Sequence, residues 1–340
     1  MSWFTSEGKS PHHVILSQTR YVRNLASTPF PQKADQKVID RFFEKTEPLL
    51  VKNGFRKESL PEGALPEVAA FAEKSFIDRD FICCEGRRAL FFNEPCSLAV
   101  ALGGSDLINI RSLLAGNAIS ETRNIASGAE ALLDREFEFA YSDGLGYISS
   151  SPALCGSGVE FSSLLYLPSL KINKNAEEVR YQCAVIGARL FPFIADSNSD
   201  LYLLSLSPAP FSSETLAAKT FGALISKMIG DEERSERIIF AQRGKLITER
   251  AWRAYGILTN ARMLSENELL SFSSDLRFAL AVCEDTASLP PVKISALNLL
   301  LADGLNSSVI SSDSKCKSAE DCDCARARTV HKTLASDQAS

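Results

Sequence analysis

The stretch FAYSDGLGYISSSPALCGSGVEFSSLLYLPSL, residues 139–170, decides the fold class of this chain. Its first two glycines predict a turn that leads into a short strand at 147–148, because glycine adopts turn conformations that other residues avoid. A second glycine-containing loop leads into the apolar run 161–170, which we interpret as helix-like. A turn, a strand, a loop and an apolar run in such close succession indicate a mixed α and β protein.

The segments on either side alternate between strand and helix patterns. Residues 88–102 predict two apolar strands joined around Pro95, because proline fits a connection better than a central strand. A long helix is predicted to begin near Ser212 or Ser213, since serine caps helices and Glu214 follows in the first turn. The other predicted elements are helices at about 33–52 and 120–139 and strands at 107–114, 180–192 and 200–206.

The character of the sequence changes near Asp231, where strand signals become rare and charged helical sequence begins. This change predicts two domains, a strand-rich domain over 1–240 and a helical domain over 241–340. Hydrophobic content falls again at 306–314, so we expect the tail 306–340 to be partly flexible.

Composition excludes several classes of protein. The 340 residues are 45% hydrophobic and 23% charged, with a formal net charge of −5. These values exclude global disorder, a coiled coil and a collagen-like fibre, and they argue against a nucleic-acid binder dominated by phosphate contacts. We find neither a run of about 18 apolar residues nor a signal-peptide-like start, so we expect a cytoplasmic protein without a membrane segment.

Histidine and cysteine usage limits the chemistry. The three histidines are His12, His13 and His331, which disfavours serine hydrolysis, cysteine proteolysis and histidine-ligated zinc catalysis in the body of the chain. Nine cysteines at irregular spacing predict reduced thiols, most of them packed in the core. The late cysteines 316, 322 and 324 have only His331 as a possible fourth ligand, and we expect no metal.

Six collinear segments carry a family resemblance. They include VILSQTRYVRNLASTPFP at 14–31, FFNEPCSLAVAL at 91–102, the stretch 139–170, and three C-terminal segments, AWRAYGIL, DLR and SAEDCDCARARTVHKTL. In this order they resemble the bacterial protein arginine kinases, members of the phosphagen (ATP:guanido) kinase family. The resemblance implies an α+β fold, with an antiparallel sheet flanked by helices followed by an all-helical C-terminal domain. In the family that domain mediates dimerisation and binds phosphoarginine.

The resemblance also implies catalytic positions, and most of them carry other residues here. Phosphoryl transfer from ATP to a guanidinium needs arginines and Mg²⁺ around the triphosphate, and carboxylates that orient and deprotonate the acceptor. The glutamates of the family's N-E-E-D-H-L-R motif correspond to Gly104 and Ser105, and its C-P-T-N cysteine corresponds to Ser151. Asp106 is retained, and we interpret it as a structural acid.

The positions that the resemblance assigns to nucleotide binding have also lost most of the family's residues. Replacement of an arginine by Glu160 turns an attraction of about 4 kcal/mol, at about 4 Å and a dielectric near 20, into a similar repulsion. The loop 156–158 could offer backbone N–H groups to an anion, but we favour a plain tight turn. By resemblance the remnants of the nucleotide site are Arg20, Arg189, Gly156, Ser157 and Gly158, and the degenerate positions are Gln18, Ser75, Asn109 and Glu160.

These losses favour a pseudokinase with a binding or regulatory role. Its predicted partners are proteins: a second copy in a homodimer, a kinase or activator, or a component of a protease system. We expect it to bind neither nucleic acid nor a membrane. We expect no cofactor. Mg-ATP is expected to bind only if kinase activity is retained.

Two alternatives remain open. One is an active ATP:guanido phosphotransferase with rearranged catalytic groups, using Asp106, Asp196 or Asp200. The other is a phosphoarginine reader whose C-terminal pocket keeps Asp323 and Arg326 as remnants, with Cys322 in place of the family's preceding arginine.

Overall fold

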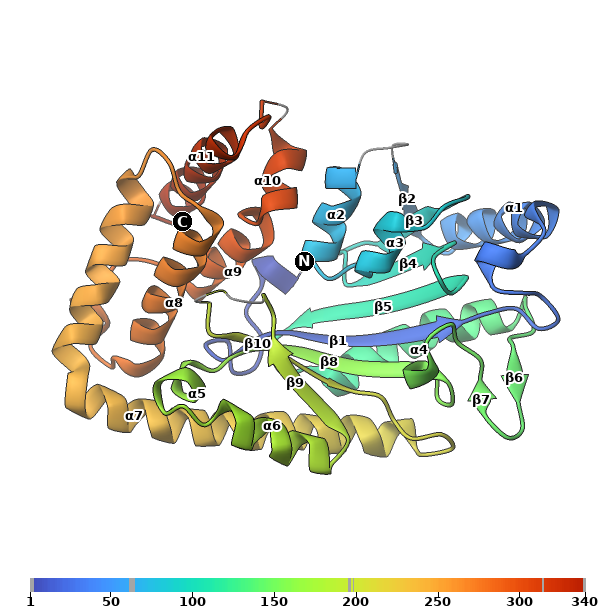
Figure 1. Ribbon diagram of the computed structural model, residues 1–340, viewed down its shortest axis with the longest axis horizontal. Coiled ribbons are helices and arrows are strands. Elements are labelled where there is room, and N and C mark those ends of the chain that lie inside the picture. Colours follow the sequence, from blue (N-terminus) through green and yellow to red (C-terminus); the bar gives the residue numbers. More distant parts are fainter. Residues whose placement is uncertain (1–2, 61–64, 195–196, 198, 314, 339–340) are drawn as a thin grey trace.

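The computed structural model describes residues 3–60, 65–194, 197, 199–313 and 315–338. In this part of the chain an eight-stranded sheet has the order β2-β3-β4-β5-β1-β8-β10-β9, and each neighbouring pair is antiparallel (Figure 1). The strands are β1 (Val14–Arg23), β2 (Phe55–Glu58), β3 (Ala89–Asn93), β4 (Leu98–Leu102), β5 (Ile108–Ala115), β8 (Val159–Tyr166), β9 (Ala188–Pro192) and β10 (Leu201–Leu206), with β6 (Tyr141–Ser142) and β7 (Gly146–Tyr147) in a separate hairpin.

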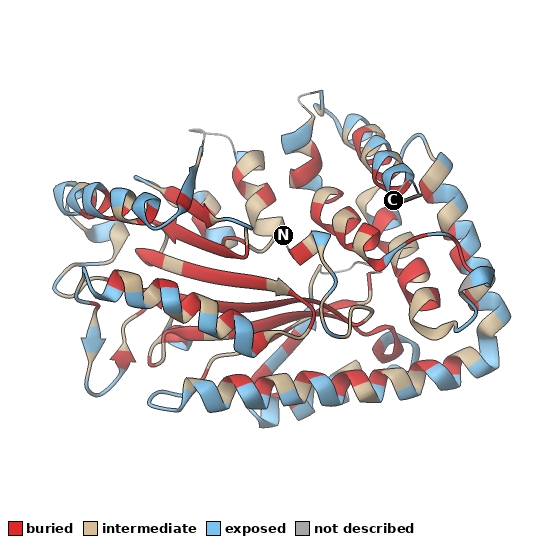
Figure 2. Ribbon diagram, turned by 180° about the vertical axis from the view of Figure 1, so that it is seen from behind, coloured by how far each residue is buried: buried red, intermediate tan, exposed pale blue. Residues whose placement is uncertain are grey.

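Helices cover one face of the sheet and part of the other. On the covered face, α1 (Gln36–Lys52), α4 (Ile119–Asp134) and the first part of α7 (Glu214–Asn260) bury their apolar sides against the strands. On the other face, the short helices α2 (Leu65–Glu73) and α3 (Arg79–Cys83) pack over β3 and β4. Seen from behind, the sheet is almost entirely buried, while the helices alternate between buried and exposed positions (Figure 2). Such alternation is typical of amphipathic helices.

The helical C-terminal region is continuous with the sheet. Helix α7 runs past residue 240, and its backbone is non-helical at Arg243, where the second half of the helix begins. Side chains of this second half share one apolar core with residues of β1, β8 and β10. The remaining helices are α5 (Pro168–Ile172), α6 (Ala176–Val185), α8 (Glu266–Val282), α9 (Ile294–Asp303), α10 (Asn306–Ser312) and α11 (Ala319–Gln338), with 3₁₀ turns at Trp3–Thr5, Pro31–Lys33, Pro152–Leu154 and Thr286–Ser288.

The predicted α+β class, with an antiparallel sheet and flanking helices, is confirmed, and three local predictions are wrong. The apolar run 161–170 is mostly β8, because a strand buried on both faces is apolar throughout and lacks the alternation of a half-buried strand. The predicted strand 180–192 begins as helix α6, and only its last five residues form β9. Segment 306–314 was expected to be a loose connection, and instead it contains helix α10.

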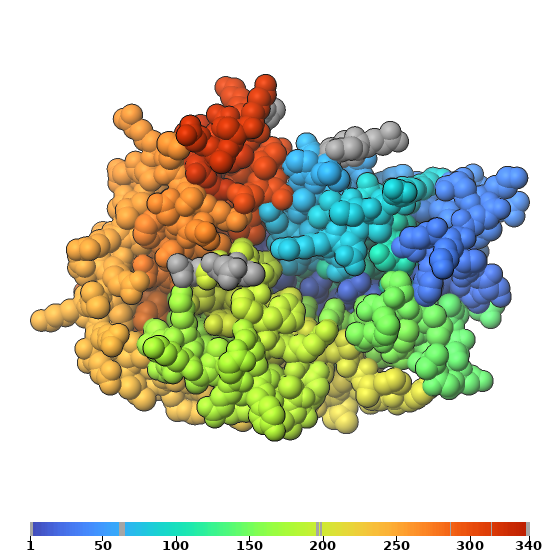
Figure 3. Space-filling model, in the orientation of Figure 1, coloured from blue at the N-terminus to red at the C-terminus, as the bar shows by residue number. Residues whose placement is uncertain are grey.

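A carboxylate from the sheet domain holds α10 in place. Glu73, at the end of α2, accepts hydrogen bonds from the backbone N–H groups of Ser307 and Ser308, each at 2.8 Å. These amides belong to the first turn of α10, which has no partners for them within the helix. Lys74 pairs with Asp303 at 2.7 Å beside this contact. The two regions therefore lie directly against each other, as the space-filling view also shows (Figure 3).

Within the described ranges no single helix has the length and apolarity to cross a bilayer, and only α9 and α10 taken together, bent by 76°, reach that composition.

Candidate functional site

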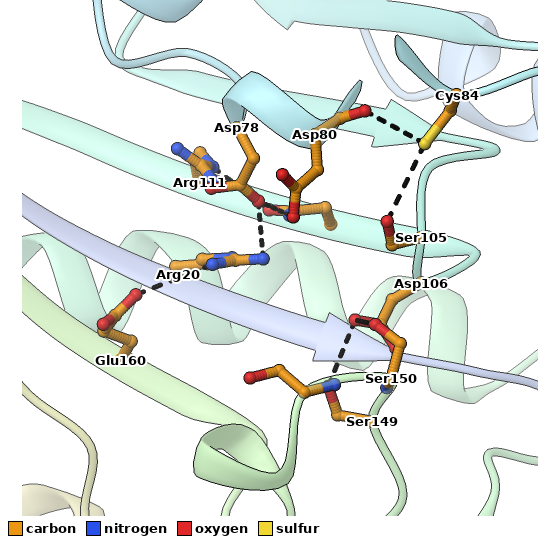
Figure 4. A network of polar contacts seen from close by, with 12 residues as sticks. Arg20, Asp78, Asp80, Cys84, Ser105, Asp106, Arg111, Ser149, Ser150 and Glu160 are labelled. Atoms are coloured by element: carbon orange, nitrogen blue, oxygen red, sulfur yellow. Dashed lines mark hydrogen bonds and ion pairs between the residues drawn. The ribbon is translucent and has the colours of Figure 1, made fainter. Parts of the chain in front are cut away.

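Three charged side chains form a row across the centre of the sheet. Arg20 in β1 lies directly opposite Glu160 of β8 on one side and Arg111 of β5 on the other. Directly opposed residues project from the same face of a sheet, so the three side chains stand next to each other (Figure 4). Thr19, one residue earlier, points to the opposite face of the sheet and forms a hydrogen bond with Thr122 of α4 at 2.8 Å. The row therefore lies on the face that α4 leaves uncovered.

Asp78 occupies the space between the two arginines. It precedes α3, and its Oδ2 lies 2.5 Å from Nη2 of Arg20, while its Oδ1 contacts Nη2 of Arg111. The side-chain amide of Asn109 donates a further hydrogen bond to Oδ2 at 3.0 Å. Burial disfavours the charged form, but Arg111 and Arg20 outweigh it and lower the pKa of Asp78 to about 2. The carboxylate is therefore ionised and binds both guanidinium groups.

Glu160 forms ion pairs with two arginines, Arg20 and Arg189. Its Oε2 lies 3.6 Å from Nη1 of Arg20, and its Oε1 lies 3.3 Å from Nη2 of Arg189 in β9. Arg20 thus has a carboxylate on each side. Arg189 is the more exposed of the two arginines, with 58% of its side chain accessible against 16% for Arg20.

The prediction that this face has lost its cations is wrong in one respect. Asn109 stands where the resemblance implies an arginine, but Arg111 follows it two residues later on the same face of β5. Arg111 is buried, and its Nε donates to Asn109 Oδ1 at 3.2 Å. The period of two along a strand was the sequence signal that points to Arg111. No sequence pattern pointed to Asp78.

The degenerate positions Gln18 and Ser75 hold the segment that carries Asp78 against the sheet. The side-chain amide of Gln18 donates to the carbonyl oxygen of Ser75 at 3.2 Å, and Nη1 of Arg111 donates to the same oxygen at 3.4 Å. Ser75 itself has a positive φ of 66°, which turns the chain from α2 toward Asp78. Asp78 is therefore positioned by backbone contacts as well as by its charge.

Asp106 is saturated with hydrogen bonds on the same side of the sheet (Figure 4). It accepts from Asn24 Nδ2 at 2.7 Å, from the backbone N–H of Ser150 at 2.6 Å and from the hydroxyls of Ser150 and Ser149 at 2.7 and 3.1 Å. Only 6% of the residue is exposed. The carboxylate fastens the loop at 149–150 to Asn24, and its oxygens have no room for an acceptor guanidinium.

The degenerate catalytic positions lie near Asp106 and supply no other acid. A side chain at Gly104 would meet Phe81 at 3.3 Å. The Ser105 hydroxyl lies 3.8 Å from the Cys84 thiol, and the Ser151 N–H donates to Ser149 Oγ at 3.1 Å.

The alternative carboxylates do not join the row. Leu201, which follows Asp200, pairs with Tyr166, six residues along β8 from Glu160. At about 3.3 Å per residue, Asp200 is on the order of 20 Å from the row. Its Oδ2 accepts a hydrogen bond from Ser274 Oγ of α8 at 2.7 Å. Asp196 lies outside the described residues.

The loop 156–158 is a packed turn. The N–H groups of Gly156 and Gly158 donate to the carbonyl oxygens of Tyr147 and Leu154 at 3.0 and 3.1 Å, and the Ser157 hydroxyl donates to the carbonyl of Pro208. Gly158 has a φ of +60°, and a Cβ there would come within 2.3 Å of a guanidinium nitrogen of Arg23. These two amides are therefore already used and do not form an anion site.

Comparison with known proteins finds two family models that match parts of the chain. Residues 56–190 match the family model "ATP:guanido phosphotransferase, C-terminal catalytic domain", and residues 244–340 match "Protein-arginine kinase McsB C-terminal domain". The chain is therefore similar to the protein arginine kinases. It is 25% identical to a protein-arginine kinase of Pelotomaculum thermopropionicum over 82% of this chain and 81% of that protein. It is 23% identical to one of Clostridium kluyveri over 98% of both.

Solved guanidino kinases share the fold of the sheet domain. The substrate-free duplicated taurocyamine kinase of Schistosoma mansoni matches 67% of this chain with a TM-score of 0.55 and 18% identity, and the match covers 33% of that duplicated chain. Lombricine kinase matches 67% of this chain and 68% of its own with a TM-score of 0.53 and 15% identity.

In the region that matches the protein-arginine-kinase C-terminal domain, Arg326 is a buried structural group. Only 1% of the residue is exposed. Its Nε donates to the carbonyl of Gly304 at 2.8 Å, its Nη1 to the carbonyl of Leu264 at 2.7 Å and to Asp323 Oδ1 at 2.6 Å, and its Nη2 to Asn306 Oδ1. Every terminal nitrogen of the guanidinium thus has a partner inside the chain.

The late cysteines of the chain lie near the start of α11. All nine cysteines are free thiols. Burial and a hydrogen bond with Cys322 raise the pKa of Cys316 to about 11, so this thiol is protonated at neutral pH. Among the residues that the structure describes, no three His, Cys, Asp or Glu side chains are grouped in a way that holds a metal ion.

Proposed function

We propose that this chain is a protein-arginine-kinase-like protein that has lost phosphoryl transfer and serves a binding or regulatory role. The observation that carries the proposal is Asp78, which binds Arg20 and Arg111 at once. Two of the cations on the open face of the sheet are thereby bound to a carboxylate of the same chain.

Electrostatics make this arrangement unfavourable for ATP. A triphosphate that approaches Arg20 must displace Asp78 and then lie close to both Asp78 and Glu160. Two like charges at about 4 Å repel by about 4 kcal/mol at an effective dielectric near 20. Since the low pKa keeps Asp78 ionised at neutral pH, protonation does not relieve this repulsion.

The acceptor side supports the same proposal. Gly104 and Ser105 have no carboxylate, and the oxygens of Asp106 are fully hydrogen-bonded. Loss of a general base typically lowers a rate by 10²–10⁴-fold. Together, the nucleotide side and the acceptor side support a protein that has the fold of a kinase but does not transfer phosphoryl groups.

One observation favours the alternative, an active ATP:guanido phosphotransferase. Arg20, Arg111 and Arg189 lie on three strands of one face, and they would form a cationic site for Mg-ATP if Asp78 and Glu160 rotated away. A phosphoarginine reader has less support, because Arg326 is buried and four of its five N–H groups are already hydrogen-bonded within the chain.

For the partners we propose proteins in the cytoplasm: a second copy bound through the helical region, a kinase or its activator, or a component of a protease system. The support is the match of residues 244–340 to the protein-arginine-kinase C-terminal domain.

Two measurements on the full chain test the proposal. Calorimetric titration with Mg-ATP is expected to give no saturable heat. Mass spectrometry after incubation with ATP and an arginine-rich protein is expected to detect no phosphoarginine, with a catalytically active protein-arginine kinase as positive control. Phosphoarginine formed by this chain but not by its Arg111→Met variant would establish the alternative.

A further inference from the structure

Arg277 in α8 is a buried cation that has no counter-charge among the residues that the structure describes. The residue is 4% exposed, and its Nη2 donates to Asn298 Oδ1 of α9 at 2.6 Å. Its Nη1 is buried and has no hydrogen-bond partner, and no carboxylate within the described ranges forms an ion pair with it. The Tyr166 ring lies 5.8 Å from the guanidinium carbon. An unpaired buried charge costs several kcal/mol, so such groups are normally compensated.

A second unpaired donor lies beside the same small cavity. The cavity has a volume of about 20 Å³ and lies where α8 and α9 meet the ends of β1, β8 and β10 (Figure 1). Arg277 and Ser273 both line it, and the buried Ser273 hydroxyl also has no partner. Ser274 lines it too, but its hydroxyl is engaged with Asp200 and Tyr166. The cavity therefore presents one cationic N–H and one O–H that need an acceptor.

The occupant is defined by size and charge. A space of this volume holds one particle of about the size of a water molecule, which excludes phosphate, sulfate and nucleotides. Water would satisfy the hydrogen bonds but would leave the charge of Arg277 uncompensated. Burial lowers the pKa of Arg277 to about 10, so the guanidinium remains charged at neutral pH.

Apolar side chains form the rest of the wall. They are Ile15, Leu201, Leu269, Leu270, Leu297 and Leu301. A wall of this kind suits a monatomic anion, which needs few directed contacts. We propose that Arg277 and Ser273 bind one halide ion, chloride in the cell, at the junction between the sheet and the helical region.

This ion would fasten two parts of the molecule together. Ile15, Tyr166 and Leu201 belong to the sheet, whereas Arg277 and Asn298 belong to α8 and α9. Chloride binds the closed junction and not the unfolded chain, so it stabilises the folded protein in proportion to its occupancy. The site is separate from the arginine row and does not depend on the proposed loss of kinase activity.

Thermal unfolding in different sodium salts tests the site. At matched ionic strength, chloride and bromide are expected to raise the Tm by a few degrees above gluconate, which is too large to enter, and the rise saturates with concentration. Arg277→Met is expected to remove the difference between the salts, and Ser273→Ala to reduce it. Arg250→Met is the matched control, because Arg250 is an exposed arginine of the same junction and should leave the difference unchanged.

Crystals grown in sodium bromide provide a readout that does not depend on variants that fold poorly. The expected result is an anomalous peak within hydrogen-bonding distance of Arg277 Nη1 and Ser273 Oγ. Equal Tm values of the unmodified protein in chloride and gluconate, or a cavity without an anomalous peak, would overturn the proposal.

Discussion

The two arginines Arg111 and Arg326 are both buried and each pairs with an aspartate, but they differ in their other hydrogen-bond partners. Arg111, in the sheet, binds the side-chain carboxylate of Asp78, which comes from a separate short helix. Arg326, in α11, binds two backbone carbonyls, of Leu264 and Gly304, together with neighbouring side chains. A side chain rotates away more easily than a backbone carbonyl held in a packed helix connection. The comparison indicates that the anion at Arg111 is exchangeable, whereas the contacts of Arg326 are structural.

Loss of Arg326 should have the largest effect on stability. Arg326→Met leaves the carbonyls of Leu264 and Gly304 and the side chain of Asn306 without their donor in a buried place. Unsatisfied buried polar groups cost about 1–3 kcal/mol each, so we expect a loss of about 5 kcal/mol in the free energy of unfolding. Urea denaturation measures this loss. Pyrophosphate should act equally on the unmodified protein and on Arg326→Met, and a stabilisation that the variant loses would show that Arg326 is part of an anion site.

Loss of Asp78 should be smaller and should respond to anions. Asp78→Asn leaves Arg111 without a counter-charge and Arg20 with Glu160 alone, and removal of one partner of a buried pair costs about 3 kcal/mol or more. Because Arg111 is then unpaired, pyrophosphate should stabilise this variant more than the unmodified protein in urea denaturation. Asp80→Asn is the matched control, since Asp80 is an exposed acid in the first turn of the same helix. If pyrophosphate acts equally on both variants, the anion at Arg111 is not exchangeable.

Acid provides an independent test of the same pair. The pKa of Asp78 in the folded protein, about 2, is below its ordinary value of 3.8. The stabilising contribution of this carboxylate is therefore complete above pH 4 and is lost as the pH falls toward 2. A shift of this size corresponds to about 2 kcal/mol. The difference in unfolding free energy between the unmodified protein and Asp78→Asn should narrow by this amount between pH 5 and pH 2.

The sequence was sufficient for the fold class and for part of the row. The family resemblance predicted the antiparallel sheet, and the strand period predicts that Asn109 and Arg111 share a face. An arginine two residues from the position at which the resemblance implies one can therefore be found in the sequence. The helix-like interpretation of 161–170 was wrong because a fully buried strand and a buried helix have the same apolar composition.

Asp78 and the environment of Arg277 depend on tertiary structure alone. Asp78 reaches the row only because Gln18 and Arg111 hold the carbonyl of Ser75, and these residues are far apart in the sequence. Arg277 belongs to a segment that resembles the family, but its lack of a counter-charge depends on which residues α9 and the strand ends bring near it. Neither propensity nor periodicity contains this information.

Glu160 should have the smallest effect, and it tests which carboxylate dominates the row. Glu160→Gln leaves Arg20 bound to Asp78 and releases Arg189, whose side chain is already 58% exposed. Ion pairs with an exposed partner contribute about 1 kcal/mol or less, so we expect a loss within that range in urea denaturation. Glu249→Gln, which breaks the exposed pair with Arg253, is the matched control and should cost no more. A loss at Glu160 as large as that at Asp78 would reverse their order. Glu160 would then be the principal counter-ion of Arg20, and displacement of Asp78 alone would not open the row to an anion.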